Sequence, residues 1–116
     1  MKGKYHLVIG NKKLVYELDI ERQITVIKGN SATGKSTLVD MFSQIFNKKR
    51  TGLHCNMTDK LLVLTGSSDW KFLISVHKNK IFIADEDIEY IQTKEFADFI
   101  RLNDNYFIFI TRLQGF

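Results

Sequence analysis

Apolar and polar residues alternate along the first part of the chain in the way that is typical of β-strands. Residues 5–9 and 13–18 are short, rich in β-formers and roughly alternating, and Gly10-Asn11 between them predicts a hairpin turn. Residues 24–28 predict a third strand, which Gly29 ends. The first two strands are too closely connected for a parallel crossover, so we expect them to be antiparallel.

The spacing between apolar residues changes from Lys35 onward, where they recur every three or four positions. They form one helical stripe made of Leu38, Met41, Phe42, Ile45 and Phe46. We expect this helix to end near residues 47–50, with the basic run Lys48-Lys49-Arg50 in its last turn, where positive charge suits the helix dipole. Residues 51–60 have no clear period and are expected to form a connection.

The second half of the chain predicts three strands, at residues 61–65, 80–85 and 106–111, each with an apolar body. Two helices are expected between them. The first would be capped within Ser67-Ser68-Asp69, although the β-formers at 72–76 leave a strand open as the alternative. The second would be capped by Thr93.

Apolar strands that alternate with helices indicate an α/β fold, in which a mainly parallel sheet is covered on both faces. The 116 residues provide for one domain, residues 1–116, with the antiparallel hairpin at its N-terminus. No apolar run approaches the length of a membrane span, and the N-terminus lacks the apolar core of a signal peptide. The single cysteine, Cys55, fits a reducing compartment, so we expect a cytoplasmic protein without membrane insertion.

The formal charge of +4 favours anionic partners such as nucleotides, nucleic acids or acidic surfaces. The densest basic run, Lys48-Lys49-Arg50, is shorter than a nucleic-acid-binding arm, and a solvated helix end is the simpler interpretation. His54 and Cys55 are adjacent but have no third ligand nearby in the sequence, so we do not expect a metal site there.

One motif carries specific chemistry. Eight consecutive residues match the phosphate-binding loop pattern at every fixed position, between a predicted strand and a predicted helix: Gly29, Asn30, Ser31, Ala32, Thr33, Gly34, Lys35 and Ser36. Glycines allow the backbone to approach a ligand closely, and the N–H groups of the loop then converge on a phosphate at the positive end of the helix. We expect Lys35 to contact the β- and γ-phosphates, Ser36 to ligate Mg²⁺, and Thr37 to lie near the α-phosphate.

Two acids follow the apolar strand at residues 80–85. We expect Asp85 to hold the Mg²⁺ site and Glu86 to position or deprotonate the water that attacks the γ-phosphate. Asp87 and Glu89 are expected to be surface acids. Solvated acids after a strand are the alternative interpretation for Asp85 and Glu86.

Thr111 and Arg112 follow the last predicted strand, at the sheet edge where ligands bind in open α/β folds. Thr111 would sense the γ-phosphate or its attacking water, and Arg112 would offset charge there. A polar end to a buried strand explains the same two residues equally well.

These residues resemble the P-loop NTPases with an additional catalytic glutamate, the division that holds the ATP-binding-cassette and AAA-type ATPases. In that division an extra strand lies between the phosphate-loop strand and the acidic strand; residues 61–65 match it by order, and residues 106–111 match the following sensor strand. The chain is also similar to small uncharacterised bacterial ATP-binding proteins. The resemblance implies a three-layer sandwich with ATP and Mg²⁺ as ligands. It also suggests an aromatic residue upstream of the loop, Tyr5 or Tyr16, for stacking on adenine, although packing within the hairpin is the favoured role for both.

The chain departs from this division in two ways. The Leu-Ser-Gly-Gly-Gln signature of cassette ATPases is missing, and no fifth strand or final helix is predicted after residues 106–111. We therefore expect a domain that is short at its C-terminal end, with the phosphate-loop strand near an exposed edge unless the hairpin or another chain covers it.

The expected function is ATP binding with slow Mg²⁺-dependent hydrolysis, either by a trimmed domain on its own or by a domain whose site a second copy or a partner protein completes. A nucleotide-dependent switch or assembly module, a small-molecule kinase and a DNA-associated ATPase of a mobile element remain the alternatives.

Overall fold

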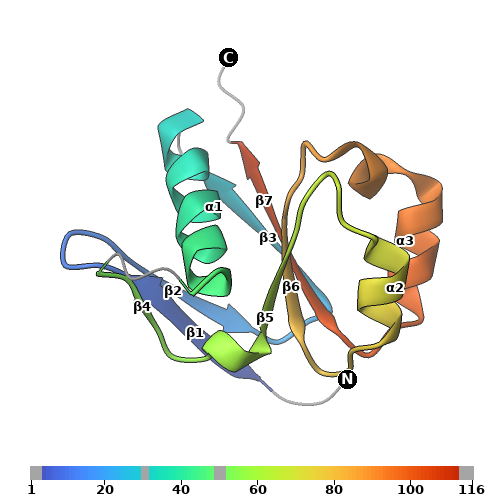
Figure 1. The fold of residues 1–116 in the computed structure, drawn as a ribbon, viewed down its shortest axis with the longest axis horizontal. Helices are drawn as coiled ribbons and strands as arrows, with labels where there is room; N and C mark the ends of the chain where they lie inside the picture. The colour runs from blue at the N-terminus through green and yellow to red at the C-terminus, as the bar shows by residue number, and fades with distance from the viewer. Residues whose placement is uncertain (1–3, 30–31, 49–51, 113–116) are drawn as a thin grey trace.

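The computed structural model describes residues 4–29, 32–48 and 52–112, apart from the side chains of residues 32–36 and 112. It contains two sheets (Figure 1). The antiparallel sheet has the order β2–β1–β4, made of Val15–Ile20, Tyr5–Gly10 and His54–Cys55. The parallel sheet has the order β3–β7–β6–β5, made of Ile24–Gly29, Tyr106–Arg112, Ile81–Asp85 and Leu61–Leu64.

Within the described residues, three α-helices cover the parallel sheet. Helix α1 (Ala32–Phe46) lies on one side, together with the antiparallel sheet, and α2 (Trp70–Ser75) and α3 (Lys94–Arg101) lie on the other (Figure 1). Two short 3₁₀ helices, η1 (Thr58–Lys60) and η2 (Glu89–Gln92), join the elements. The prediction of an α/β fold with a parallel sheet and an N-terminal antiparallel hairpin is therefore confirmed, and the structure adds that the hairpin lies in a sheet of its own.

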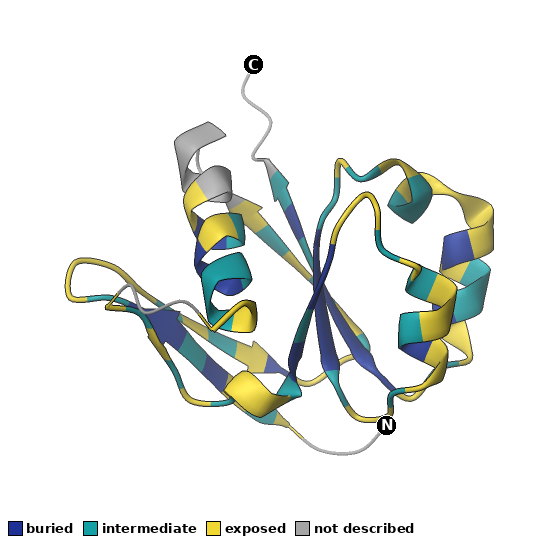
Figure 2. Ribbon diagram, viewed as in Figure 1, coloured by how far each residue is buried: buried dark blue, intermediate teal, exposed yellow. Residues whose placement is uncertain are grey.

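Buried side chains concentrate along the parallel strands (Figure 2). Alternate residues of β6 face opposite sides: Ile81 and Ile83 join the core under α1, and Phe82 and Ala84 join the core under α2 and α3. Burial on both faces explains why the strand is continuously apolar. No helix among the described residues has the length and apolar character that crossing a bilayer requires.

The hairpin turn differs from the prediction, because it spans residues 11–14 and leaves Gly10 inside β1, opposite Val15. The side chain of Asn11 closes the turn by accepting hydrogen bonds from the backbone N–H groups of Lys13 and Leu14, at 2.8 and 2.9 Å. A glycine is needed at position 10 for lack of space and not for a turn conformation. A Cβ at this position would lie 2.4 Å from the Leu14 carbonyl oxygen.

Helix α1 also differs at both ends. It begins at Ala32 instead of Lys35, since Ala32 is the single apolar residue of its first turn and one residue gives no spacing that could reveal a helix. It ends at Phe46, so Lys48 lies beyond the last turn with a φ of 58°, and Lys49 and Arg50 lie outside the described residues. The predicted stripe is buried at Leu38, Met41 and Phe42, whereas Phe46 is 41% exposed.

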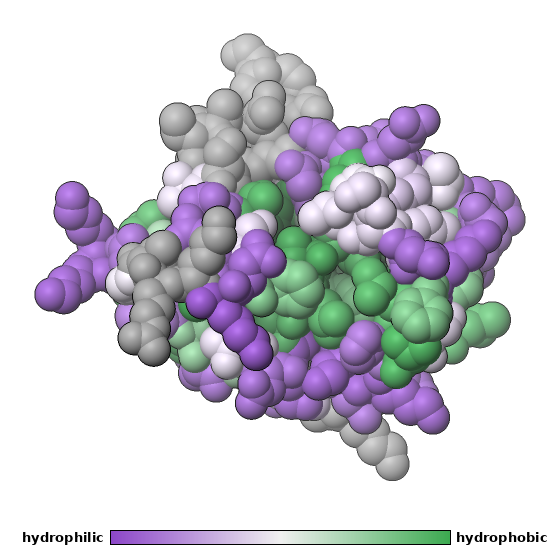
Figure 3. Space-filling model, in the orientation of Figure 1, coloured by the Kyte–Doolittle hydropathy of each residue, from purple (hydrophilic) through white to green (hydrophobic). Residues whose placement is uncertain are grey.

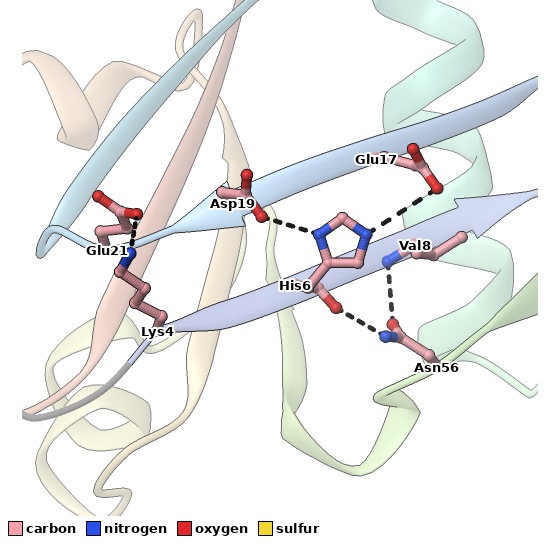
Figure 4. A network of polar contacts seen from close by, with 7 residues as sticks. All are labelled: Lys4, His6, Val8, Glu17, Asp19, Glu21 and Asn56. Carbon is pink, nitrogen blue, oxygen red and sulfur yellow. Dashed lines mark hydrogen bonds and ion pairs between the residues drawn. The ribbon is translucent and has the colours of Figure 1, made fainter.

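The expected connection at residues 51–60 contains β4 and η1. Strand β4 pairs with the end of β1. The next residue, Asn56, also bonds to β1: its side chain accepts a hydrogen bond from the Val8 N–H and donates one to the His6 carbonyl (Figure 4). A two-residue strand has no period, so sequence patterning could not reveal it.

The two later helices begin as predicted. Asp69 caps α2 by accepting from the Phe72 N–H, and Thr93 caps α3 by accepting from the Phe96 N–H. The strand alternative at residues 72–76 is excluded, because most of this segment is helical.

Strand β3 lies at one edge of the parallel sheet, with β7 as its neighbour among the described strands. The hairpin belongs to the other sheet and does not pair with β3, so the strand before the predicted phosphate loop lies at a sheet edge that the hairpin does not cover, within the described residues. Ile24 and Val26 of β3 are 44% and 51% exposed, on the face that α2 and α3 cover elsewhere.

The outer face of the hairpin carries a charged cluster (Figure 4). Nδ1 of His6 lies 2.8 Å from an Asp19 carboxylate oxygen, and Nε2 lies 3.9 Å from one of Glu17. The hydrogen bond to Asp19 raises the pKa of His6 above its ordinary value, and the charge of Glu17 adds to the effect. Beside it, Lys4 pairs with Glu21 at 3.0 Å.

The His6–Asp19 pair predicts a pH-dependent contribution to stability. Because the folded pKa of His6 is raised, the contribution is complete below about pH 6.5 and disappears as the pH rises through the folded value. His6→Ala should therefore lower the urea midpoint more at about pH 5.5 than at about pH 8.5. Introducing His6→Ala into an Asp19→Asn background should reduce this difference; an unchanged difference would show that Asp19 is not its source.

Candidate functional site

The carboxyl ends of the four parallel strands meet at one edge of the sheet. Gly29 at the end of β3 pairs with Arg112 at the end of β7, and Asp85 at the end of β6 pairs with Ile110 of β7. Helix α1 starts at Ala32, three residues after β3 ends. The fold thus brings the glycine-rich loop, the acidic segment and the end of β7 to a common edge.

The structure describes part of the glycine-rich loop. Gly29 closes β3, Asn30 and Ser31 lie outside the described residues, and the backbone of residues 32–36 forms the start of α1. The side chains of Lys35 and Ser36, which are predicted to bind phosphate and metal, are not among those that the structure describes, and neither is the side chain of Arg112. The start of a helix at this edge provides N–H groups and a positive dipole end for an anion.

The acidic segment after β6 is held in a tight turn. An Asp85 carboxylate oxygen accepts from the Asp87 N–H at 2.8 Å, and the Asp85 carbonyl accepts from the Ile88 N–H at 3.1 Å. The Glu86 N–H continues the sheet pairing by donating to the Ile110 carbonyl at 3.0 Å, and its own carbonyl accepts from the Gln92 side chain. The backbone that carries both acids is therefore fixed to β7 and η2.

Glu86 and Thr111, both predicted as site residues, are in direct contact. The Thr111 hydroxyl donates to a Glu86 carboxylate oxygen at 2.9 Å, and both side chains are half-buried. A threonine hydroxyl has a single hydrogen to donate. In this structure that hydrogen is engaged by Glu86.

The other predicted residues are distributed as follows. Thr37 is exposed on α1, and Asp87 and Glu89 are exposed beside the acidic turn, as expected of surface acids. Tyr5 packs edge-on against Tyr106, with ring centroids 5.2 Å apart.

Because Tyr106 begins β7, Tyr5 lies at the amino edge of the parallel sheet, opposite the candidate site. This position excludes Tyr5 as the residue that stacks on a nucleotide base at the carboxyl edge. Tyr16 packs against the core between the antiparallel sheet and α1.

Sequence reasoning missed Thr65, the residue that follows β5. A pocket of about 180 Å³ opens between α1 and the ends of β5 and β6, and Thr65, Asp85 and Ser43 contribute to its lining; we call it the Asp85 pocket. The Thr65 hydroxyl lies 3.2 Å from the hydroxyls of Ser67 and Ser68. The run of polar residues directly after an apolar strand was the available signal, since such residues gather at the carboxyl edge of a parallel sheet.

Within the described part of the chain, no group of three or more His, Cys, Asp or Glu side chains is arranged to hold a metal ion. A magnesium site at this edge would therefore combine Asp85 with oxygens from the glycine-rich loop. Carboxylate and hydroxyl oxygens are hard ligands of the kind that Mg²⁺ prefers, so Asp85 and Ser36 fit the ion chemically.

Comparison with protein-family models, with curated proteins and with solved structures found no match to this chain. The functional argument therefore depends on the residues and on the geometry of the carboxyl edge.

Proposed function

We propose that the chain is a P-loop NTPase that binds ATP with Mg²⁺ at the carboxyl edge of the parallel sheet and hydrolyses it slowly. The observation that carries the proposal is the convergence at this edge of a complete phosphate-loop sequence, between β3 and α1, with Asp85-Glu86 at the end of β6. A glycine-rich turn that merely connects a strand to a helix would not require two acids on the same edge.

The strand order supports the same proposal. The NTPase division that the sequence resembles has an extra strand between the phosphate-loop strand and the acidic strand. In this sheet β7 lies between β3 and β6, while β5 lies at the far edge. By position in the sheet, the extra strand of that division corresponds to β7, which carries Thr111 and Arg112, and not to residues 61–65, which match it by chain order.

Each residue then has a proposed role. Lys35 and the loop backbone bind the phosphates, and Ser36 and Asp85 hold the Mg²⁺, which when bound neutralises charge on the β- and γ-phosphates. Glu86 orients or deprotonates the attacking water. Arg112, whose backbone pairs with that of Gly29, is assigned to offset charge at the loop.

The contact between Thr111 and Glu86 refines the role of Thr111. Because its hydroxyl hydrogen is donated to the carboxylate, we assign Thr111 to positioning Glu86 instead of direct sensing of the γ-phosphate. A carboxylate held between this hydroxyl and a turn fixed to β7 loses little freedom when a substrate binds.

Efficient turnover of a nucleoside triphosphate usually needs a further positive charge, which many P-loop enzymes receive from a second protein. We therefore propose that a second copy or a partner completes the site. The single half-buried cysteine, Cys55, suits a cytoplasmic setting for this activity.

Lys35→Ala tests nucleotide binding. Removal of the ammonium group should weaken Mg-ATP binding at least about thirtyfold in a calorimetric titration, because a point charge on the phosphates is lost. Lys78→Ala removes an exposed lysine between α2 and β6 and should leave the affinity unchanged. Equal affinity of the Lys35→Ala variant and the unsubstituted protein would overturn the proposal.

Glu86→Gln tests hydrolysis separately from binding. The amide cannot act as a base, so the turnover number should fall about a hundredfold or more while ATP affinity changes little. The control is Glu89→Gln, which alters an exposed acid in η2 and should leave both unchanged. Hydrolysis at the unsubstituted rate would remove Glu86 from catalysis and favour a nucleotide-dependent switch.

Thr111→Val tests the positioning role. The substitution keeps the shape of the side chain and removes the hydroxyl, so turnover should fall about tenfold with ATP affinity retained. Thr111→Ser, which restores the hydroxyl, should recover most of the activity. If Thr111→Val instead weakens ATP binding with turnover unaffected, Thr111 contacts the nucleotide and does not position Glu86.

A further inference from the structure

Strand β3 is less covered than the other parallel strands. Most residues of β5, β6 and β7 are buried, whereas Ile24, Val26 and Lys28 of β3 are exposed, the first two by 44% and 51%. These three alternate residues share one face of the strand, and Ile27 on the other face packs against the core under α1. Parallel strands are ordinarily covered on both faces. One face of β3 therefore lacks a cover within the described part of the chain.

The backbone of the same three residues is directed away from the sheet. The Gln23 carbonyl accepts from the Phe107 N–H at 2.7 Å, and Ile24 lies opposite Phe107 in the pairing of β3 with β7. Successive residues of a strand direct their N–H and C=O groups to opposite sides. Because Gln23 faces β7, Ile24 and the other two exposed residues face the free side, where their N–H and C=O groups have no hydrogen-bond partner among the described residues. We call this free side, with the three exposed side chains, the β3 edge.

The β3 edge is already held in extended conformation. All six residues of β3 pair with β7. The Gln23 side chain donates to the carbonyls of Ile100 and Asn103 at 2.6 and 3.0 Å, which fixes the start of the strand against the end of α3. A segment that binds here does not have to order the strand first, so less of its binding free energy is lost to ordering.

A positive charge lies at each end of the β3 edge. Lys28 is the last residue but one of the strand, and Arg22 lies two residues before its start. Both side chains are exposed, and no carboxylate that the structure describes forms an ion pair with either. Ile24 and Val26 lie between them. A segment with apolar residues in its middle and an acidic residue toward each end would be complementary to this edge.

A second exposed apolar surface offers less to a partner. Figure 3 shows apolar side chains gathered over β5 and α2. Phe72 of α2 and Val76, directly after it, are 60% and 54% exposed. Three of the four residues of β5, however, are at most 9% exposed. That surface presents side chains alone, whereas the β3 edge presents side chains together with free backbone groups.

We propose that the β3 edge binds an extended acidic segment of a partner protein, which adds to the parallel sheet as a strand beside β3. The residues of the segment opposite Ile24 and Val26 are apolar, and those nearest Arg22 and Lys28 are acidic. Its main chain pairs with the free N–H and C=O groups of β3. Main-chain hydrogen bonds then provide affinity, and the side chains provide specificity.

A second copy of this chain fits the edge less well than an acidic segment. If two copies paired antiparallel with Ile24 of one opposite Val26 of the other, Arg22 of each would approach Lys28 of the other, and like charges opposite each other destabilise a strand pair. With Val26 opposite Val26, Lys28 of each copy would lie opposite Ile24 of the other. Neither register gives the cations an acidic partner.

The test uses the peptide Glu-Thr-Val-Thr-Val-Thr-Glu, acetylated and amidated at its ends. Its sequence reads the same in both directions, so the test does not depend on the direction of the added strand. The control, Val-Thr-Glu-Thr-Glu-Thr-Val, has the same composition, charge and alternation but exchanges the acidic and apolar positions. In an NMR titration of the isotope-labelled protein, the first peptide should bind at least about fivefold more tightly than the control.

Amide hydrogen exchange identifies the mode of binding. The amides of Ile24, Val26 and Lys28 face the free side, so saturating peptide should slow their exchange at least about threefold. The amides of Thr25 and Ile27 face β7 and should change little. A segment that docked through side chains alone would not produce this alternation along the strand.

Charge reversal locates the site. Arg22→Glu and Lys28→Glu should each weaken binding of the acidic peptide at least about fivefold. The protein with both substitutions should instead prefer Lys-Thr-Val-Thr-Val-Thr-Lys, which a mere loss of folding could not produce. Lys12→Glu, in the turn of the antiparallel hairpin, changes the net charge by the same amount as either single substitution and should leave binding unchanged.

Tighter binding of the first peptide, with alternating protection of β3 and a preference that reverses with the charges, would support the proposal. Equal binding of the first peptide and its control would overturn it, because charge attraction alone would then explain the binding. No binding up to about millimolar peptide would also overturn it and assign Arg22 and Lys28 to keeping other strands away from an open edge. Dimerisation that protects the same amides would assign the edge to a second copy. All of these measurements are made without nucleotide, so their outcome is independent of the proposed ATPase activity.

Discussion

The arrangement of the candidate site depends on the burial of β7. This strand pairs with β3 on one side and with β6 on the other, and its side chains alternate between two cores: Ile108 and Ile110 face α1, and Phe107 faces α2 and α3. A shift of one residue would exchange these two sets and place each in the wrong core. Burial thus fixes the register, and the register in turn sets Arg112 beside Gly29 and the end of β6 beside Ile110.

A buried polar residue holds the opposite end of the same strand. Asn105 is fully buried, accepts from the Lys80 N–H and donates to the carbonyls of Ile74 and His77, so it joins the start of β7 to the end of α2 and the start of β6. Buried amides satisfied in this way define one arrangement of the chain, because any other leaves polar groups unpaired. The amino edge of the sheet is therefore held in one arrangement, and the carboxyl edge carries the loops of the candidate site.

Much of the fold could be predicted from local pattern, because each parallel strand has an apolar body and α3 has a clear cap at Thr93. The order of the strands could not, since an apolar run such as residues 106–111 does not indicate which strands it will lie between. For the same reason the contact between Thr111 and Glu86, which are 25 residues apart, had no sequence signal. Errors in detail came from competing local interactions, such as the Asn11 side chain that moved the hairpin turn past Gly10.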